Sequence, residues 1–148
     1  MPESSVAGVL REAARQLVEE LDAAGCAISR LIGEMLVELA EHTTTGRTLI
    51  LGHGYLLSDY PLTREVFETH SPRIASLADE EPEPSEAKVL EELGLETVLM
   101  LPLEVEGRPW ALIEIYHSGD GRFSDDDVRR AEELVADAAR RLAALEPA

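Results

Sequence analysis

The 148-residue chain is 45% hydrophobic and 29% charged, which is the size and composition of one globular domain. Its 30 acidic and 13 basic residues give a net charge of −17, which argues against a surface for nucleic acid or anionic lipid. No apolar run approaches the ~20 residues of a membrane span, and Met1–Ser5 lacks the features of a signal peptide, so we expect a cytoplasmic protein.

The chain begins with a predicted helix and a predicted hairpin. Apolar residues recur every three or four positions from about Ser5 to Asp22, which indicates an amphipathic helix. Cys26–Ile32 and Met35–Leu39 are apolar segments on either side of Gly33. This pattern predicts two antiparallel strands joined by a tight turn.

The middle of the chain is less regular. After a Thr-rich loop, Leu49–Leu51 is apolar and Gly52–Tyr55 is too rich in glycine for regular structure. Pro61 suits the first turn of a short helix that reaches about Thr69, and Ile74–Leu77 is a candidate short strand.

An acidic stretch from Asp79 to Glu96 precedes the last part of the domain. Its first residues, Asp79–Pro84, predict an extended solvated loop. Ser85 is the expected N-cap of a second short helix, and Gly94 is its expected C-terminal end.

The strongest strand patterns are Thr97–Leu103 and Trp110–Tyr116, joined by a turn at Glu106–Gly107. The final helix begins with a capping box in which Ser124 and Asp127 take the two capping positions.

The two late strands are apolar on both faces, so the sheet must be covered on both sides. We expect the first and last helices to cover one face and the irregular middle to roof the other, where a small-molecule cavity could open. Hairpin connections favour an antiparallel sheet and an α+β class. No linker divides the chain, so residues 1–148 form one expected domain with its core at about 5–145.

The order and spacing of these segments resemble those of a GAF domain over about Ser5–Leu145. The residues that carry the resemblance are Cys26–Leu31, Gly54–Thr63, Gly94–Leu103, Ala111–Tyr116 and Arg122–Asp127.

The resemblance implies a sheet of about six strands and a regulatory role. Tyr60–Thr63 and the Glu-rich insert are similar to GAF domains of bacterial sensory proteins, which accompany kinase, cyclase or phosphatase output domains. Family ligands range over cyclic nucleotides, bilins, haem and small metabolites, so the fold alone does not identify a ligand.

Several of these ligands and activities find no support in the sequence. The Asn-Lys-Phe-Asp-Glu motif of the best-known cyclic-nucleotide members requires Asn, which this chain lacks. The lone Cys26 lies on the first predicted strand, away from the roof, which disfavours bilin attachment and fits a buried hydrophobic role. One cysteine also cannot complete the disulfide cycle of the family's methionine-sulfoxide reductases.

The histidines are scattered, at His42, His53, His70 and His117, with no pair at metal-binding spacing. His53 in the glycine-rich stretch is the one that could face the cavity, and nothing else supports haem binding. With no defensible nucleophile–base pair, we expect no enzyme activity.

Glu114 is the most informative polar residue, because it lies between two isoleucines on a strand predicted to be central. A half-buried carboxylate there needs a partner: either an internal salt bridge or hydrogen bond, for which Arg30 and Arg64 are candidates, or a ligand above it. The candidate ligand-binding residues are Tyr55, Tyr60, Arg64, Met100, Glu114 and Tyr116, with Leu57, Val66 and Leu112 as further apolar wall.

The last helix carries a seam in steps of three and four, formed by Val128, Ala131, Val135, Ala138, Leu142 and Leu145. This seam either packs on the domain's own sheet or also pairs with a second copy. Two hypotheses follow: a sensory module that binds a small molecule and dimerises through its terminal helices, or a purely structural dimerisation module without ligand.

Overall fold

A single antiparallel sheet forms the centre of the molecule. The computed structural model describes residues 5–44, 54–118 and 122–145. Six strands pair in the order β3-β2-β1-β6-β5-β4, so β1 and β6 are central. The strands are β1 (Gly25–Ile32), β2 (Met35–Thr43), β3 (Gly54–Leu56), β4 (Arg73–Ser76), β5 (Thr97–Val105) and β6 (Arg108–His117).

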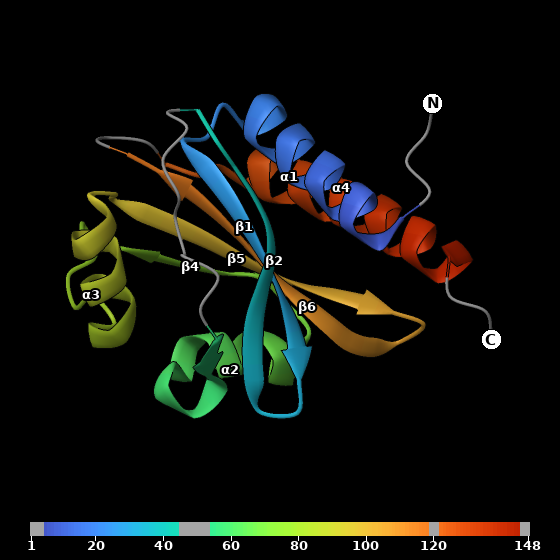
Figure 1. Ribbon diagram of the computed structural model, residues 1–148. Helices are drawn as coiled ribbons and strands as arrows, with labels where there is room; N and C mark the ends of the chain where they lie inside the picture. Colours follow the sequence, from blue (N-terminus) through green and yellow to red (C-terminus); the bar gives the residue numbers. More distant parts are fainter. Residues whose placement is uncertain (1–4, 45–53, 119–121, 146–148) are drawn as a thin grey trace.

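Helices cover both faces of this sheet (Figure 1). The long first and last helices lie side by side on one face, and the two short helices lie on the other side. The helices are α1 (Val6–Leu21), α2 (Pro61–Thr69), α3 (Pro84–Leu93) and α4 (Asp125–Leu145). The expected α+β class and the division of the helices between two faces are therefore confirmed. In the described part of the chain, no helix combines the length and apolar character needed to cross a bilayer.

The first hairpin is longer than expected. β2 continues to Thr43 rather than ending at Leu39, because Gly25 pairs with Thr43 at the far end of the β1–β2 ladder. Gly54 and Tyr55, expected to be irregular, form part of β3 and pair with β2. Leu49–Leu51 and His53 lie outside the described residues.

The start of α3 corrects the expected N-cap. Glu83, not Ser85, caps the helix, and its carboxylate accepts a hydrogen bond of 2.8 Å from the backbone N–H of Glu86. Pro84 occupies the first helical turn, where a missing N–H costs nothing. Glu86, in the first turn of this helix and four residues before the buried Leu90, faces inward and is buried.

Alternating residues of β6 contribute to two separate cores. Ile113 and Ile115 lie in the core beneath α1 and α4, which we call the helix-side core. Leu112 and Tyr116 belong to the core beneath α2 and α3, which we call the roof-side core. The sheet is thus buried on both faces, as its sequence pattern predicts.

The predicted capping box of α4 is present. The backbone N–H of Asp127 donates to Ser124 Oγ at 3.1 Å, and the N–H of Ser124 donates back to Asp127 Oδ2 at 2.9 Å. The seam beyond it is occupied within the chain. Ala131, Val135, Ala138 and Leu142 are buried in the helix-side core, and Val128 and Leu145 pack against it. Four of the six seam residues are therefore used within the chain's own core, while Val128 and Leu145 are only partly buried.

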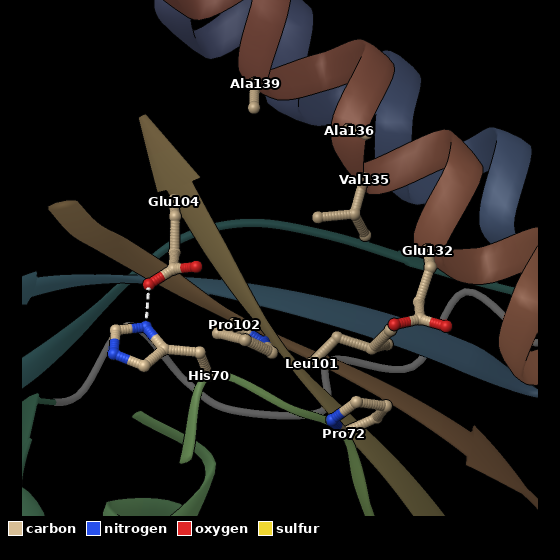
Figure 2. Close-up of a pocket in the computed structure, with 9 residues that line it drawn as sticks. All are labelled: His70, Pro72, Leu101, Pro102, Glu104, Glu132, Val135, Ala136 and Ala139. Carbon is tan, nitrogen blue, oxygen red and sulfur yellow. Dashed lines mark hydrogen bonds and ion pairs between the residues drawn. The ribbon is translucent and has the colours of Figure 1, made fainter. Parts of the chain in front are cut away.

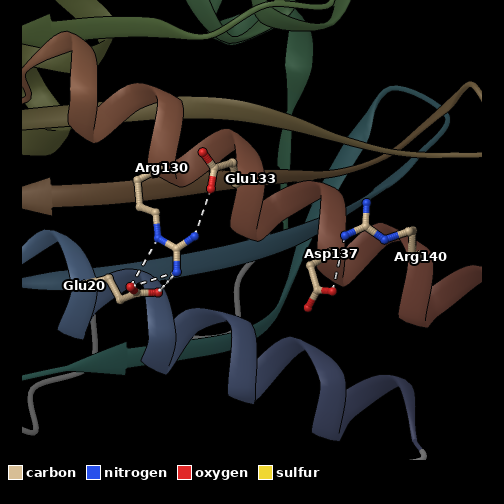
Figure 3. A network of polar contacts seen from close by, with 5 residues as sticks. All are labelled: Glu20, Arg130, Glu133, Asp137 and Arg140. Carbon is tan, nitrogen blue, oxygen red and sulfur yellow. Dashed lines mark hydrogen bonds and ion pairs between the residues drawn. The ribbon is translucent and has the colours of Figure 1, made fainter.

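Polar contacts join α1 and α4 at their outer edge (Figure 3). Arg130 on α4 donates to both carboxylate oxygens of Glu20 on α1, at 2.9 and 2.8 Å. The same guanidinium bonds Glu133 on its own helix at 2.9 Å. These groups are partly exposed, so they add to a helix pairing that rests mainly on apolar contact.

Candidate functional site

The candidate site is built around Glu114, on the roof side of a central strand. Glu114 pairs with Ala27 of β1 and Met100 of β5, and only 5% of its surface is exposed. Tyr116, which donates a hydrogen bond to Glu114, lies in the roof-side core. The structure thus gives Glu114 the buried central position expected from the sequence.

Two phenols hold the Glu114 carboxylate. Tyr55 on β3 donates to Oε1 at 3.1 Å, and Tyr116 donates to Oε2 at 3.0 Å. Burial raises the pKa of Glu114, and the two phenol hydrogen bonds oppose that rise only in part. Burial beside the Glu114 carboxylate also raises the pKa of Tyr55 and of Tyr116. Both phenols are therefore donors across the ordinary pH range.

The two arginines considered as partners of Glu114 have other contacts. Arg30 donates to the carbonyls of Leu31 and Trp110, each at 2.9 Å, and its guanidinium lies 4.2 Å from the centre of the Trp110 ring. Arg64 forms an exposed ion pair with Glu34. Of the internal partners considered for Glu114, the structure shows hydrogen bonds, and they come from two tyrosines and not from Arg30 or Arg64.

A second buried carboxyl, which the sequence interpretation missed, lies on α3. Glu86 is 3% exposed, and Thr63 on α2 donates to its Oε2 at 3.2 Å. Burial, followed by the negative charge of Glu114, raises the pKa of Glu86 to about 8. The signal for Glu86 was its spacing: it lies four residues before Leu90, on the same helix face.

Thr63 connects this carboxyl to the sheet. Its Oγ1 also lies 3.4 Å from the sulfur of Met100, the residue paired with Glu114 across the β5–β6 ladder. Met100 is fully buried in the roof-side core. It therefore forms the floor between the two carboxyls rather than an exposed wall.

Two tyrosine rings and a serine complete the polar group. The rings of Tyr55 and Tyr60 pack edge to face, with centroids 5.1 Å apart. Ser29 on β1 is fully buried, and its Oγ makes no hydrogen bond within the described residues. It lies close enough to Tyr55 to lower the pKa of that phenol, against the larger effect of burial. We call Ser29, Tyr55, Thr63, Glu86, Glu114 and Tyr116 the roof-side polar cluster.

A pocket of about 280 Å³ opens beside this cluster, between the turn before α2 and the helix α3. Tyr60 is the one member of the predicted ligand-binding set among its lining residues, which are Asp59, Tyr60, Ser85, Lys88, Val89 and Glu92. Tyr55, Met100, Glu114 and Tyr116 lie deeper, in or against the roof-side core. Leu57, Val66 and Leu112 are also buried there.

Another pocket, of about 220 Å³, lies on the opposite face between α4 and β5 (Figure 2). His70, at the end of α2, forms an ion pair with Glu104 at its rim. Leu101, Pro102 and Val135 form its floor and side. The lining residues include no Ser, Thr, Cys or Lys side chain beside the histidine.

The described residues do not fit covalent bilin attachment. Cys26 is fully buried in the helix-side core, whereas the polar cluster lies on the other face of the sheet. Burial also raises the pKa of its thiol, which removes the reactive thiolate.

Histidines do not supply a metal centre here either. Within residues 5–44, 54–118 and 122–145, no three His, Cys, Asp or Glu side chains are grouped to hold a metal ion. His42 lies on β2 and His70 ends α2, while the ring of His117 packs against Phe123 with centroids 4.4 Å apart. His53, considered for haem, falls outside the described residues.

Solved structures share this architecture. The chain resembles the GAF domain/HD domain protein from Geobacter sulfurreducens, with a TM-score of 0.79 and 16% identity over 96% of this chain and 94% of that one. It also resembles the phycocyanobilin-bound GAF domain of a cyanobacterial phytochrome, with a TM-score of 0.81 and 17% identity over 95% and 86% of the two chains. A bacteriophytochrome from R. palustris matches with a TM-score of 0.84 and 12% identity over 97% of this chain and 34% of its own.

At these identities the solved structures establish the fold and leave the ligand open. No curated protein matches the sequence. A family model described as a GAF domain matches residues 3–143, nearly the whole chain. The chain therefore belongs to the GAF domain family.

Proposed function

We propose that this chain is the regulatory sensory module of a bacterial signal-transduction protein, working in the cytoplasm without catalytic activity of its own. It would bind a small molecule beneath the roof formed by α2 and α3. Membership of the GAF family supports a sensory role, because the family's domains regulate other proteins in response to small molecules.

The observation that carries the proposal is the roof-side polar cluster. Burying a carboxyl in an apolar core costs several kcal/mol unless its partners compensate, as a rough guide. Here two carboxyls, Glu86 and Glu114, are buried within one small region of the same core, although Leu or Met would fill that space at lower cost. Such a cluster is typical of a binding site, where polar groups await a partner.

A route for the signal exists in the same strand. Glu114 faces the roof, while its neighbours Ile113 and Ile115 pack beneath α1 and α4. A ligand that shifts β6 would therefore shift the packing of both terminal helices. We propose that α1 and α4 pass this change to an output domain or a second copy, through outward-facing residues rather than the buried seam.

A purely structural module is the second candidate, and one observation favours it. Both carboxylate oxygens of Glu114 already accept hydrogen bonds from tyrosines. A group so well satisfied can stay buried without a ligand.

Native mass spectrometry of freshly purified protein tests the proposal, followed by thermal melts across a metabolite panel. A sensory module should retain a small molecule or gain stability with at least one compound, because a ligand of the native state raises stability by RT ln(1 + [L]/Kd). Glu114→Gln should change that response and keep the fold, whereas the exposed control Glu106→Gln should not change it. If no compound is retained and none raises the melting temperature, the structural candidate replaces the sensory one.

A further inference from the structure

The roof-side polar cluster is unusual in the sign of its charge. The charges that act on Glu86 come from the carboxylates of Glu114 and Glu83, and those that act on Tyr60 come from Glu86, Glu114, Asp59 and Glu92. Among the described residues, no basic side chain contributes to these electrostatic effects on Glu86 and Tyr60. A ligand that enters this region therefore meets a negative field, which favours a cation.

Ser29 gives an independent sign that the cluster is incomplete. Its hydroxyl is fully buried and lies beside the Tyr55 phenol, but it completes no hydrogen bond of normal geometry within the described residues. Leaving such a group unpaired costs about 1–3 kcal/mol, so native proteins rarely keep one without a reason. Ser29 lies on the same face as Tyr55 and beside it. A ligand donor that reaches this hydroxyl would remove the penalty.

The surroundings favour an organic cation over a metal ion. Tyr55 and Tyr60 present ring faces and edges at the approach to Glu114, and aromatic faces attract ammonium groups. Val66, Met100 and Leu112 supply an apolar floor. Such a lining suits the carbon skeleton of an amine and would desolvate a hydrated metal ion at high cost.

We propose that the site beneath the roof takes a small organic cation, a primary ammonium on a short apolar body, held by the carboxylates of Glu86 and Glu114. Ser29 would accept a hydrogen bond from the same ammonium, and the ring of Tyr60 would cover it. This inference rests on the proposed sensory function and names the class of its ligand. An anionic metabolite, by contrast, would meet the buried acidic residues Glu86 and Glu114 behind a mouth whose lining residues include Asp59 and Glu92 and a single base, Lys88.

The pocket beside Tyr60 provides the entrance. It opens between Asp59 on one side and Glu92 on α3 on the other. Tyr60 forms its wall and packs against Tyr55, whose hydroxyl bonds Glu114. Two surface carboxylates thus stand at the mouth, and Lys88 is the single base among the lining residues.

Binding of a cation here should release a proton. Burial and the charge of Glu114 raise the pKa of Glu86 to about 8, so at neutral pH Glu86 carries a proton. The titratable groups around it are Glu114 and Tyr116 from β6, Tyr55 from β3, Tyr60 before α2 and Glu83 on its own helix. Since the phenols stay protonated, an ammonium beside Glu86 would displace that carboxyl's proton to the buffer.

Isothermal titration calorimetry with n-butylammonium tests the inference, against butyrate and 1-butanol as probes of similar shape. We expect n-butylammonium to bind most tightly and to release about one proton per cation at neutral pH, measured as a dependence of the heat on buffer ionisation enthalpy. Glu86→Gln should weaken binding about tenfold or more and abolish the proton release. Glu91→Gln, on the exposed side of α3, is the matched control and should bind like the parent protein.

Two results would overturn the inference in distinguishable ways. If butyrate or a retained anionic metabolite binds and n-butylammonium does not, the site is sensory but its ligand is not a cation. If none of the probes binds and no molecule is retained, the sensory function itself fails. Equal affinity of Glu86→Gln and the parent protein for n-butylammonium would show that the cation binds elsewhere.

Discussion

The two faces of the sheet differ in what they bury. The helix-side core consists of aliphatic residues, Cys26 and Trp110. The roof-side core encloses two carboxyls, two phenols and two hydroxyls next to similar aliphatic residues. The helix-side core is thus apolar and stabilising, whereas burying polar side chains in the roof-side core lowers the stability of the fold. That contrast, rather than any single motif, locates the candidate site.

The largest expected effect comes from placing a charge in the helix-side core. Leu142→Glu or Val135→Glu would bury a carboxylate among aliphatic side chains of α1, α4 and the sheet. We expect a loss of at least about 4 kcal/mol, which is comparable to the total stability of many domains. Circular dichroism should show an unfolded or strongly destabilised chain, not a folded monomer.

The neighbouring substitution Ala136→Glu is the matched control for this prediction. Ala136 is exposed on α4, and the introduced carboxylate would lie four residues before Arg140. It should melt close to the parent protein. A folded, monomeric Leu142→Glu protein would mean that the seam serves association rather than the core.

On the roof side, stability should fall as the pH rises. The pKa of Glu86 is raised from 4.5 to about 8, so the folded protein keeps a proton that the unfolded chain has released. The stabilisation is complete below about pH 4.5 and is lost as the pH rises toward 8. The change in the free energy of unfolding is on the order of 5 kcal/mol.

Glu86→Gln should remove most of this dependence of the free energy of unfolding on pH, because glutamine does not ionise and still accepts a hydrogen bond from Thr63. Urea denaturation at a series of pH values from acid to mildly alkaline measures the dependence. Glu91→Gln is the control and should retain it. An unchanged slope in Glu86→Gln would place the titrating group elsewhere in the cluster.

Removing one phenol donor should have an intermediate effect. Tyr116→Phe leaves Glu114 Oε2 without its 3.0 Å hydrogen bond while keeping the ring that fills the roof-side core. We expect a loss of about 1–3 kcal/mol, measured by urea denaturation. The loss should shrink at low pH, where the carboxyl is protonated and needs the donor less. A loss that stays constant with pH would indicate a packing effect alone.

Local signals in the sequence predicted much of this fold. The capping box at Ser124 and Asp127 located the start of α4, because capping depends on neighbours three residues apart. Alternation along β6 gave the face of Glu114, since side chains in a strand point to opposite sides in turn. These features need no knowledge of distant parts of the chain.

Features set by distant contacts were missed. The partner of Glu86 is Thr63 on α2, 23 residues earlier in the chain, which no local pattern indicates. Arg30 donates hydrogen bonds to carbonyl groups on its own strand and on the neighbouring strand, and its guanidinium lies over the Trp110 ring. Arg64 forms an ion pair with Glu34. Neither arginine therefore pairs with Glu114. The spacing of Glu86 and Leu90 was available in the sequence, but a glutamate is seldom expected to face a core.

The smallest expected effect tests whether exposed ion pairs hold the two long helices together. Arg130 contacts Glu20 across the α1–α4 junction and Glu133 within α4, and all three side chains are substantially exposed (Figure 3). Solvent and salt screen such pairs, so Arg130→Ala should lower the melting temperature far less than Tyr116→Phe does. A double-mutant cycle with Glu20→Ala should give a small favourable coupling that disappears at high salt. Arg129→Ala is the matched control, since Arg129 pairs only within its helix with Asp126 among the described contacts. A coupling that survives high salt would mean that the junction excludes water, and that polar contacts stabilise the helix side as well as its apolar core does.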